Sequence, residues 1–98
     1  MAKNKKKVLV TGGRGFSGSY LVDELLKKGI SVIVLDREQA FSPDRDQWIQ
    51  STDCVTHHEN LEKVAMDLLN EKDLRHFFKD RGKEIDAIFH TASLYDYS

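Results

Sequence analysis

Cysteine and proline are almost absent from this chain, which has one of each among its 98 residues. A single cysteine, Cys54, cannot form an internal disulfide, which excludes the disulfide-stabilised secreted class and leads us to expect a reducing, cytoplasmic setting. Long apolar runs are missing as well. The run Val8–Val10, which follows a basic leader, is far shorter than a signal-peptide core or a membrane span. We therefore expect no membrane association.

An excess of charge of one sign is also missing, because 15 Lys and Arg stand against 16 Asp and Glu. The balance argues against nucleic acid as a partner. Only the leader is basic, and we interpret it as a solvated approach to the first strand rather than a nucleic-acid patch; it contains Lys3, Lys5, Lys6 and Lys7. Since 40% of residues are hydrophobic, the chain is expected to form one small folded domain.

The first third of the chain has the pattern of a strand, a helix and a second strand. Lys7–Thr11 is continuously apolar in its centre, which is typical of a parallel strand covered on both faces. Helical spacing begins at Phe16 and should stop at Gly29. A second buried strand, residues 32–35, ends at Asp36.

The remainder predicts two more helices and two more strands. Ser42 and Pro43 favour a short helix over residues 43–49, followed by a polar surface connection over residues 50–60. A third strand is expected near residues 63–66. Asn70 should cap a helix that ends at Gly82, and a fourth strand should follow within residues 85–89. Alternating strands and helices predict an α/β fold with a parallel sheet.

The segment TGGRGFSG lies between the first predicted strand and helix, where a glycine pattern indicates dinucleotide binding. Gly12 permits a tight turn, Gly15 lets the backbone approach a pyrophosphate, and Gly18 lets the helix pack closely. The helix dipole and N–H groups near Phe16 and Ser17 favour the phosphate charges. The alternative is a glycine-rich turn that binds no ligand. With this motif the predicted fold is Rossmann-type, a partial doubly wound sheet of about four strands in the order 3-2-1-4.

Asp36 lies eighteen residues after Gly18, close to the spacing of about 20 residues expected for an acid that binds the adenosine ribose. Such a carboxylate repels a 2′-phosphate, so NAD is favoured over NADP as cofactor. Arg14 and Arg37 act in the other direction, since either guanidinium can neutralise a 2′-phosphate or stack on adenine. The alternative for Asp36 is a solvated acid at the end of a strand.

At these residues the chain resembles the extended short-chain dehydrogenases/reductases. The resemblance rests on the TGxxGxxG spacing, the Asp36-Arg37 pair, the Asp67-Leu68 dipeptide and the run from His90 to Ser93, and it covers nearly the whole chain. This family includes NAD-dependent sugar epimerases and dehydratases and 3β-hydroxysteroid dehydrogenase-like proteins. The HTAS run resembles the last group.

The resemblance implies roles for two further groups of residues. Asp67 would bind the adenine amino group and the Leu68 backbone would contact the ring, although Asp67 is also compatible with an ordinary loop acid. Four residues would line the nicotinamide-side ribose: His90, Thr91, Ala92 and Ser93. The chain departs from the family at Met66, where glycine is common.

In this family a tyrosine and a lysine four residues later carry the chemistry, and that pair is missing from residues 1–98. Tyr20 is followed by Glu24 at that spacing, and for Tyr95 and Tyr97 the lysine would have to stand at positions 99 and 101. No catalytic residue is therefore assigned. We interpret residues 1–98 as the NAD(P)-binding part of an oxidoreductase or of an epimerase/dehydratase that acts on a nucleotide sugar or a hydroxysteroid-like substrate. The alternative is a self-contained dinucleotide-binding or interaction module.

Two further expectations concern surfaces. His57 and His58 are adjacent and would point to opposite faces of a strand, so no metal site is assigned. In the strand order 3-2-1-4 the fourth strand lies at an edge of the sheet. Its open hydrogen-bonding groups and apolar side chains should promote self-association.

Overall fold

The computed structural model describes residues 6–91 of the chain. Four strands alternate with three helices and two short 3-10 turns. In chain order the elements are β1 (Lys7–Thr11), α1 (Phe16–Lys27), β2 (Ser31–Asp36), a turn (Glu38–Phe41), α2 (Pro43–Ser51), β3 (Leu61–Ala65), α3 (Glu71–Arg81), a turn (Gly82–Glu84) and β4 (Ala87–His90). In this described part, no helix is long and apolar enough to cross a membrane.

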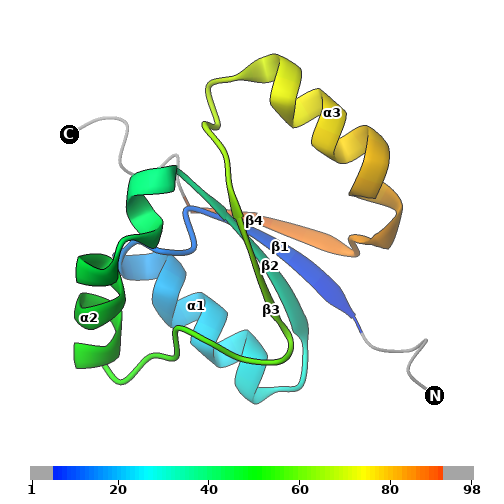
Figure 1. The fold of residues 1–98 in the computed structure, drawn as a ribbon. Coiled ribbons are helices and arrows are strands. Elements are labelled where there is room, and N and C mark those ends of the chain that lie inside the picture. Colours follow the sequence, from blue (N-terminus) through cyan, green and yellow to red (C-terminus); the bar gives the residue numbers. More distant parts are fainter. Residues whose placement is uncertain (1–5, 92–98) are drawn as a thin grey trace.

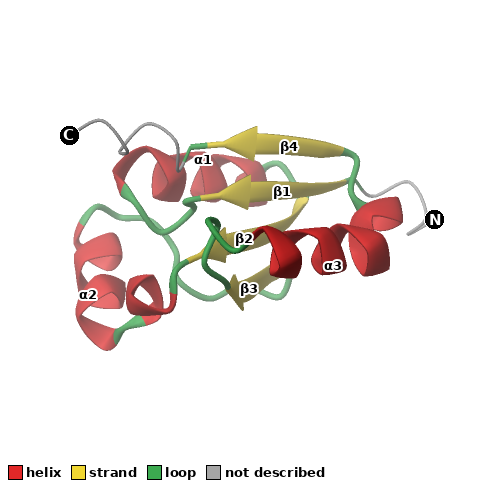
Figure 2. Cartoon of the chain, turned by 90° about the horizontal axis from the view of Figure 1, so that it is seen from above, coloured by secondary structure: helices red, strands yellow, loops and turns green. Residues whose placement is uncertain are grey.

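The four strands form one parallel sheet in the order β3-β2-β1-β4, as the sequence predicted. Leu9 lies at its centre, paired with Ile33 on one side and with Ile88 on the other. Helices α1 and α2 lie on one face of the sheet and α3 lies on the opposite face (Figures 1 and 2). Because all strands are parallel, their carboxyl ends lie at the same end of the sheet.

The alternation of side chains along β1 and β2 divides the core between these two faces. Val8 and Val10 pack with Val22 and Leu26 of α1. Leu9, which points the other way, packs with Ile33, Leu35 and Phe77 of α3. Both faces of the central strands are thus covered by helices, which explains why these strands are continuously apolar.

Both predicted helix caps are present. The Ser42 hydroxyl accepts a hydrogen bond from the Arg45 backbone N–H at 3.2 Å. The Asn70 side-chain oxygen accepts one from the Asp73 N–H at 3.1 Å. Each bond satisfies an N–H that has no partner within its own helix, so the caps fix where α2 and α3 begin.

The two later strands differ in their bounds from the sequence prediction. β3 begins at Leu61, two residues before the predicted start, and its five residues are only half-buried or exposed. It is an edge strand, so it lacks the continuous apolar run that marks β1 and β2. β4 begins only at Ala87, because the Ile85 N–H bonds to the Gly82 carbonyl in the preceding turn at 3.2 Å.

The connection between α2 and β3 is a surface loop over most of its length, as predicted, but two of its residues point inward. Cys54 and Thr56 are buried, at 4% and 3% exposure. The buried Asp23 of α1 accepts a hydrogen bond from the Val55 N–H at 3.1 Å, and the Gln50 amide donates to the Thr56 hydroxyl at 2.9 Å. These bonds hold the connection against α1.

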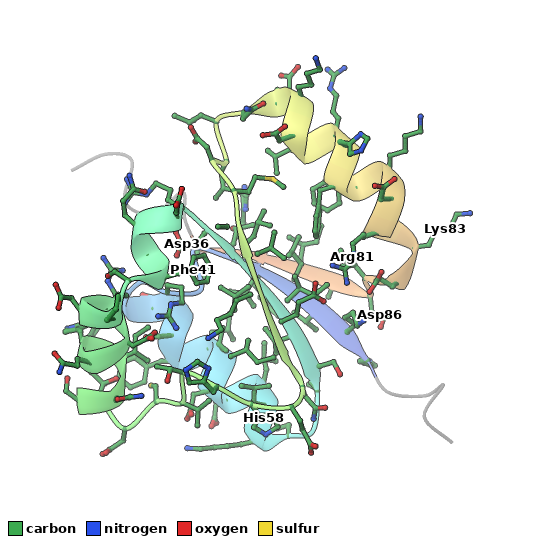
Figure 3. All side chains as sticks on the ribbon, viewed as in Figure 1. Asp36, Phe41, His58, Arg81, Lys83 and Asp86 are labelled. Carbon is green, nitrogen blue, oxygen red and sulfur yellow. The ribbon has the colours of Figure 1, made fainter. Side chains whose placement is uncertain are left out.

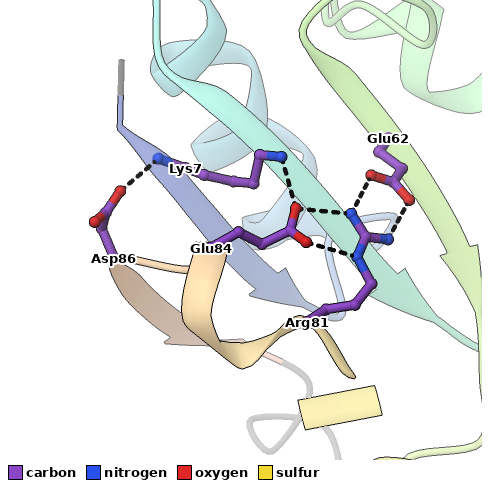
Figure 4. Close-up of polar contacts among 5 residues, drawn as sticks. All are labelled: Lys7, Glu62, Arg81, Glu84 and Asp86. Atoms are coloured by element: carbon purple, nitrogen blue, oxygen red, sulfur yellow. Dashed lines mark hydrogen bonds and ion pairs between the residues drawn. The ribbon is translucent and has the colours of Figure 1, made fainter. Parts of the chain in front are cut away.

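A network of charged residues joins the amino ends of the strands to the end of α3 (Figure 4). The Arg81 guanidinium donates to both carboxylate oxygens of Glu62, at 2.5 and 2.8 Å, and to Glu84 at 2.9 and 3.0 Å. Lys7 adds an ion pair to Glu84 at 2.7 Å. The network therefore links β1, β3 and the turn that follows α3.

This network should make the fold sensitive to acid. Hydrogen bonds from Arg81, with a further one from Lys7, lower the pKa of Glu84 from 4.5 to about 2, and Arg81 also lowers the pKa of Glu62. A carboxyl group whose pKa is lower in the folded state stabilises that state above its unfolded pKa. We expect the urea midpoint to fall as the pH drops from about 5 towards 2, and to fall less steeply in Arg81→Met.

Arg75→Met is the matched control, because Arg75 forms an exposed ion pair with Glu71 one turn away on α3. It should leave the slope against pH close to that of the parent chain. Parallel slopes for the parent and Arg81→Met would show that the network contributes nothing to acid sensitivity.

Candidate functional site

A cavity of about 860 Å³ opens at the carboxyl ends of β1, β2 and β4. Eight residues predicted from sequence line it: Gly12, Gly15, Phe16, Asp36, Arg37, Asp67, Leu68 and His90. Asp36 lies at the opposite end of the sheet from Arg81 and Asp86 (Figure 3). The candidate site is thus separated from the charged network, and it lies where parallel α/β sheets bind ligands.

The glycine turn forms one wall of this cavity. Gly12 has a φ of 72°, a left-handed conformation that side chains disfavour. Its carbonyl accepts a hydrogen bond from the Gly15 N–H at 3.1 Å. A Cβ at Gly18 would lie 2.1 Å from that same carbonyl oxygen, so only glycine lets α1 approach the turn this closely.

The first turn of α1 faces the cavity through Gly15 and Phe16. Gly15 is the N-cap residue, no side chain caps the helix there, and the first turn contains no acidic residue. Backbone N–H groups and the helix dipole therefore favour an anion at this point. Among the other predicted residues, Ser17 is exposed and Gly18 is buried beneath the turn.

The carboxylate of Asp36 is fixed by two backbone N–H groups at the end of β2. Oδ2 accepts from Arg14 N at 3.0 Å and Oδ1 accepts from Arg37 N at 2.8 Å. The residue is only 8% exposed, yet it lines the cavity. A carboxylate has about four acceptor positions, so two remain for hydroxyl groups of a ligand.

The Arg14 side chain does not lie where a cofactor role requires it. Arg14 is buried, its Nε donates to the Ala40 carbonyl at 2.9 Å, and its guanidinium pairs with Asp46 and lies over the Phe41 ring. The hydrogen bond from Arg14 lowers the pKa of Asp46. The prediction that this guanidinium reaches a ribose or adenine is therefore corrected, because the group holds α2 against the glycine turn.

Three other predicted residues occupy the rim. The exposed Arg37 side chain lines the cavity beside Asp36. Asp67 accepts a hydrogen bond from Leu69 N at 2.9 Å, which shapes the loop before α3. Leu68 is half-buried and packs against the core cluster beneath α3 while it lines the cavity.

The end of β4 is bound to the glycine turn. The Thr91 hydroxyl donates to the Thr11 carbonyl at 2.6 Å and lies 3.1 Å from the Gly12 carbonyl. His90 Nδ1 lies 2.6 Å from the Thr11 hydroxyl, and His90 lines the cavity. Thr91 thus holds the end of β4 against the glycine turn. The other two residues predicted to follow it in the site, Ala92 and Ser93, lie outside the described residues.

The sequence prediction missed five cavity residues. Arg45 and Trp48 come from α2, and the others are Ala40, Leu69 and Leu74. The spacing of three residues between Arg45 and Trp48, within a helix signalled by Ser42 and Pro43, places both on one side of that helix. Within residues 6–91, no group of three or more His, Cys, Asp or Glu residues is arranged to hold a metal ion.

Comparison with known proteins agrees with this geometry. A family model described as the NAD dependent epimerase/dehydratase family matches residues 8–98. The chain belongs to this family. The glycine turn, the uncapped helix start and the fixed carboxylate are the features that suit a dinucleotide, since they offer N–H donors to phosphates and an acceptor to ribose hydroxyls. The chain corresponds to the NAD-binding portion of the family's enzymes.

Relatives in this family are named as sugar-nucleotide enzymes. The chain is 36% identical to mouse UDP-glucose 4-epimerase over 91 residues, which is 91% of the chain and 26% of that protein. It is 32% identical over 94 residues to the pea bifunctional UDP-glucose and UDP-xylose 4-epimerase 1, covering 96% of the chain and 26% of the relative. The chain therefore spans about a quarter of the length of these relatives.

Solved structures show the same fold. An epimerase from Methanothermobacter thermautotrophicus is 36% identical and matches with a TM-score of 0.65 over 92% of the chain and 23% of its own. The Bordetella bronchiseptica enzyme WbmH, solved with NAD⁺, is 25% identical and matches with a TM-score of 0.66 over 90% of the chain and 26% of its own. The Rossmann-type fold predicted from sequence is thus confirmed.

Proposed function

We propose that this chain binds NAD in the cavity at the carboxyl edge of its sheet. The observation that carries the proposal is the joint placement of the glycine turn, the start of α1 and the fixed Asp36 carboxylate around one cavity. The pyrophosphate would lie at Gly15 and Phe16, where the uncapped first turn of α1 lines the cavity. Asp67 and Leu68 would contact adenine, and the residues from His90 to Ser93 would line the second ribose.

Asp36 supports NAD over NADP. Its two backbone hydrogen bonds keep the carboxylate in place, and its remaining acceptor positions suit the ribose hydroxyls. A 2′-phosphate would meet a fixed negative charge. Arg14 supplies no opposing charge to the cavity, since its guanidinium is paired with Asp46.

The whole protein is proposed to be an epimerase or dehydratase of a nucleotide sugar. Relatives from pea and mouse are named as UDP-glucose 4-epimerases, which supports a nucleotide sugar over a hydroxysteroid. Bound NAD supplies a hydride acceptor for such a reaction. No catalytic residue is proposed in this chain, whose printed sequence has no tyrosine followed four residues later by lysine. A single cysteine supports a cytoplasmic setting.

The exposed edge supports self-association of the isolated chain. Within residues 6–91, β4 lies at one edge of the sheet, and its Ile88 and Phe89 side chains are 51% and 42% exposed. Unpaired backbone groups beside apolar side chains favour pairing with a second strand. Light scattering after size exclusion tests this proposal, and a monomer at every concentration would contradict it.

Replacing Asp36 tests the cofactor assignment. Asp36→Asn should weaken NAD binding by roughly 1 to 3 kcal/mol, because charge-assisted hydrogen bonds to the ribose become neutral ones. The affinity for NADP should fall less, or rise, since the repulsion between the carboxylate and the 2′-phosphate disappears. Isothermal titration with both cofactors measures the ratio of affinities.

Asp53→Asn is the matched control for this variant. Asp53 has a φ of 66°, which asparagine tolerates, and it does not line the cavity. The same charge is removed, so the control separates a local effect from a change in net charge. An unchanged NAD to NADP ratio in folded Asp36→Asn would remove Asp36 from cofactor selection.

A further inference from the structure

Arg45 is a cavity residue whose side chain is held in one position. Its Nη1 donates to the Arg14 carbonyl at 2.8 Å, and its guanidinium lies 5.6 Å from the centre of the Trp48 ring. The carbonyl belongs to the glycine turn itself, directly before Gly15. Hydrogen bonding and stacking therefore place a positive charge beside the turn and reduce the entropy that a ligand contact would cost.

The guanidinium of Arg45 differs from those of Arg14 and Arg81, which are paired with carboxylates. Arg14 pairs with Asp46, and Arg81 pairs with Glu62 and Glu84. Among the residues that the structure describes, no carboxylate lies within ion-pair distance of Arg45. A half-buried guanidinium with free donors in a cavity is suited to an anionic ligand.

Trp48 contacts both the Arg45 guanidinium and the first residue of α1. The Trp48 ring lies 6.4 Å from the Phe16 ring, and Phe16 is the first residue of the helix. Arg45, Trp48 and Phe16 all line the cavity, so α2 and the first turn of α1 form adjoining parts of its wall. The guanidinium and the uncapped helix start therefore border the same part of the cavity.

We propose that Arg45 binds the pyrophosphate of the dinucleotide, as a side-chain donor that supplements the backbone donors of the glycine turn. The proposal rests on the proposed NAD site. It assigns to α2 a part in phosphate recognition, while Arg14 holds that helix through Asp46 and the preceding turn through Ala40. Trp48 acts as a positioning residue, because its ring holds the guanidinium.

Titration of the chain with adenosine, ADP, NAD and NADP tests the proposal. Arg45→Met keeps the length and apolar contact of the side chain but removes its charge. The variant should lower the affinity for ADP and NAD about tenfold or more, as expected for loss of a hydrogen bond to a charged group. Its affinity for adenosine should stay within about twofold of the parent value. Added salt should weaken ADP binding more in the parent chain than in the variant.

Two further variants keep the test decisive. Arg75→Met removes the same charge from exposed α3 and should bind all four ligands as the parent does. Arg45→Lys retains the charge without the planar fork and should bind ADP with intermediate affinity, so it serves if Arg45→Met unfolds. Urea unfolding establishes that each variant is folded.

The titrations distinguish failure of the Arg45 contact from failure of the NAD site. If the parent chain binds neither ADP nor NAD, the dinucleotide site itself is wrong. If the parent binds both and folded Arg45 variants bind them equally well, Arg45 has no phosphate contact. A loss confined to NADP would also overturn the proposal, because it would place Arg45 at a 2′-phosphate instead of the pyrophosphate.

Discussion

Replacing Gly18 with alanine should abolish NAD binding. The new Cβ would lie 2.1 Å from the Gly12 carbonyl oxygen and 2.8 Å from the Gly13 Cα, distances that backbone atoms cannot accept without moving. Either α1 or the turn must shift. Both line the cavity, so a displacement of about 1 Å would disturb the geometry that phosphate binding at the helix start requires.

Gly82→Ala is the matched control for Gly18→Ala. Gly82 has a helical backbone with φ of −60°, and an added Cβ would meet nothing closer than 4.0 Å. The control should keep the stability and NAD affinity of the parent chain, whereas Gly18→Ala should also unfold at lower urea. Calorimetry and urea titration measure both. Parent-like NAD affinity in Gly18→Ala would mean that the close approach of α1 is irrelevant to binding.

The second large effect is expected at Arg14. Arg14→Met removes the charge that faces the half-buried Asp46 and the donor that satisfies the carbonyl of the buried Ala40. Loss of Arg14 leaves the half-buried Asp46 carboxylate and the buried Ala40 carbonyl without their partner, so we expect the free energy of unfolding to fall by about 2 kcal/mol. That is a large fraction of the stability of a small domain.

A double-mutant cycle isolates this contribution. Asp46→Asn and the double variant Arg14→Met/Asp46→Asn complete the cycle, and the double variant should be less destabilised than the sum of the single changes. The NAD to NADP ratio should stay the same in every folded member. Strict additivity would show that the pair is not coupled, and a shifted ratio would place the Arg14 side chain at the cofactor after all.

The first half of the fold could be predicted from sequence because its signals are local. β1 was predicted with the observed bounds, and β2 ends at Asp36 as expected. Both are buried on two faces and so must be apolar throughout. The caps at Ser42 and Asn70 depend on residues three positions apart, and such pairs are visible in a sequence.

What could not be predicted depends on contacts between distant residues. Arg14 and Asp46 are 32 positions apart, and nothing in the local pattern distinguishes a buried guanidinium from one that faces a ligand. Cys54 is buried because the neighbouring Val55 N–H bonds to Asp23 of α1. For the same reason the sequence did not predict that Arg45 lines the cavity, since this depends on its contact with the Arg14 carbonyl in a distant turn.

The most direct test of the account is a parallel titration of the chain with NAD and NADP. We expect both cofactors to bind in the same cavity, NAD to bind more tightly, and Asp36→Asn to reduce this preference. Competition between the two cofactors would establish the common site. Tighter binding of NADP, or no heat of binding with NAD by a folded chain, would contradict the account.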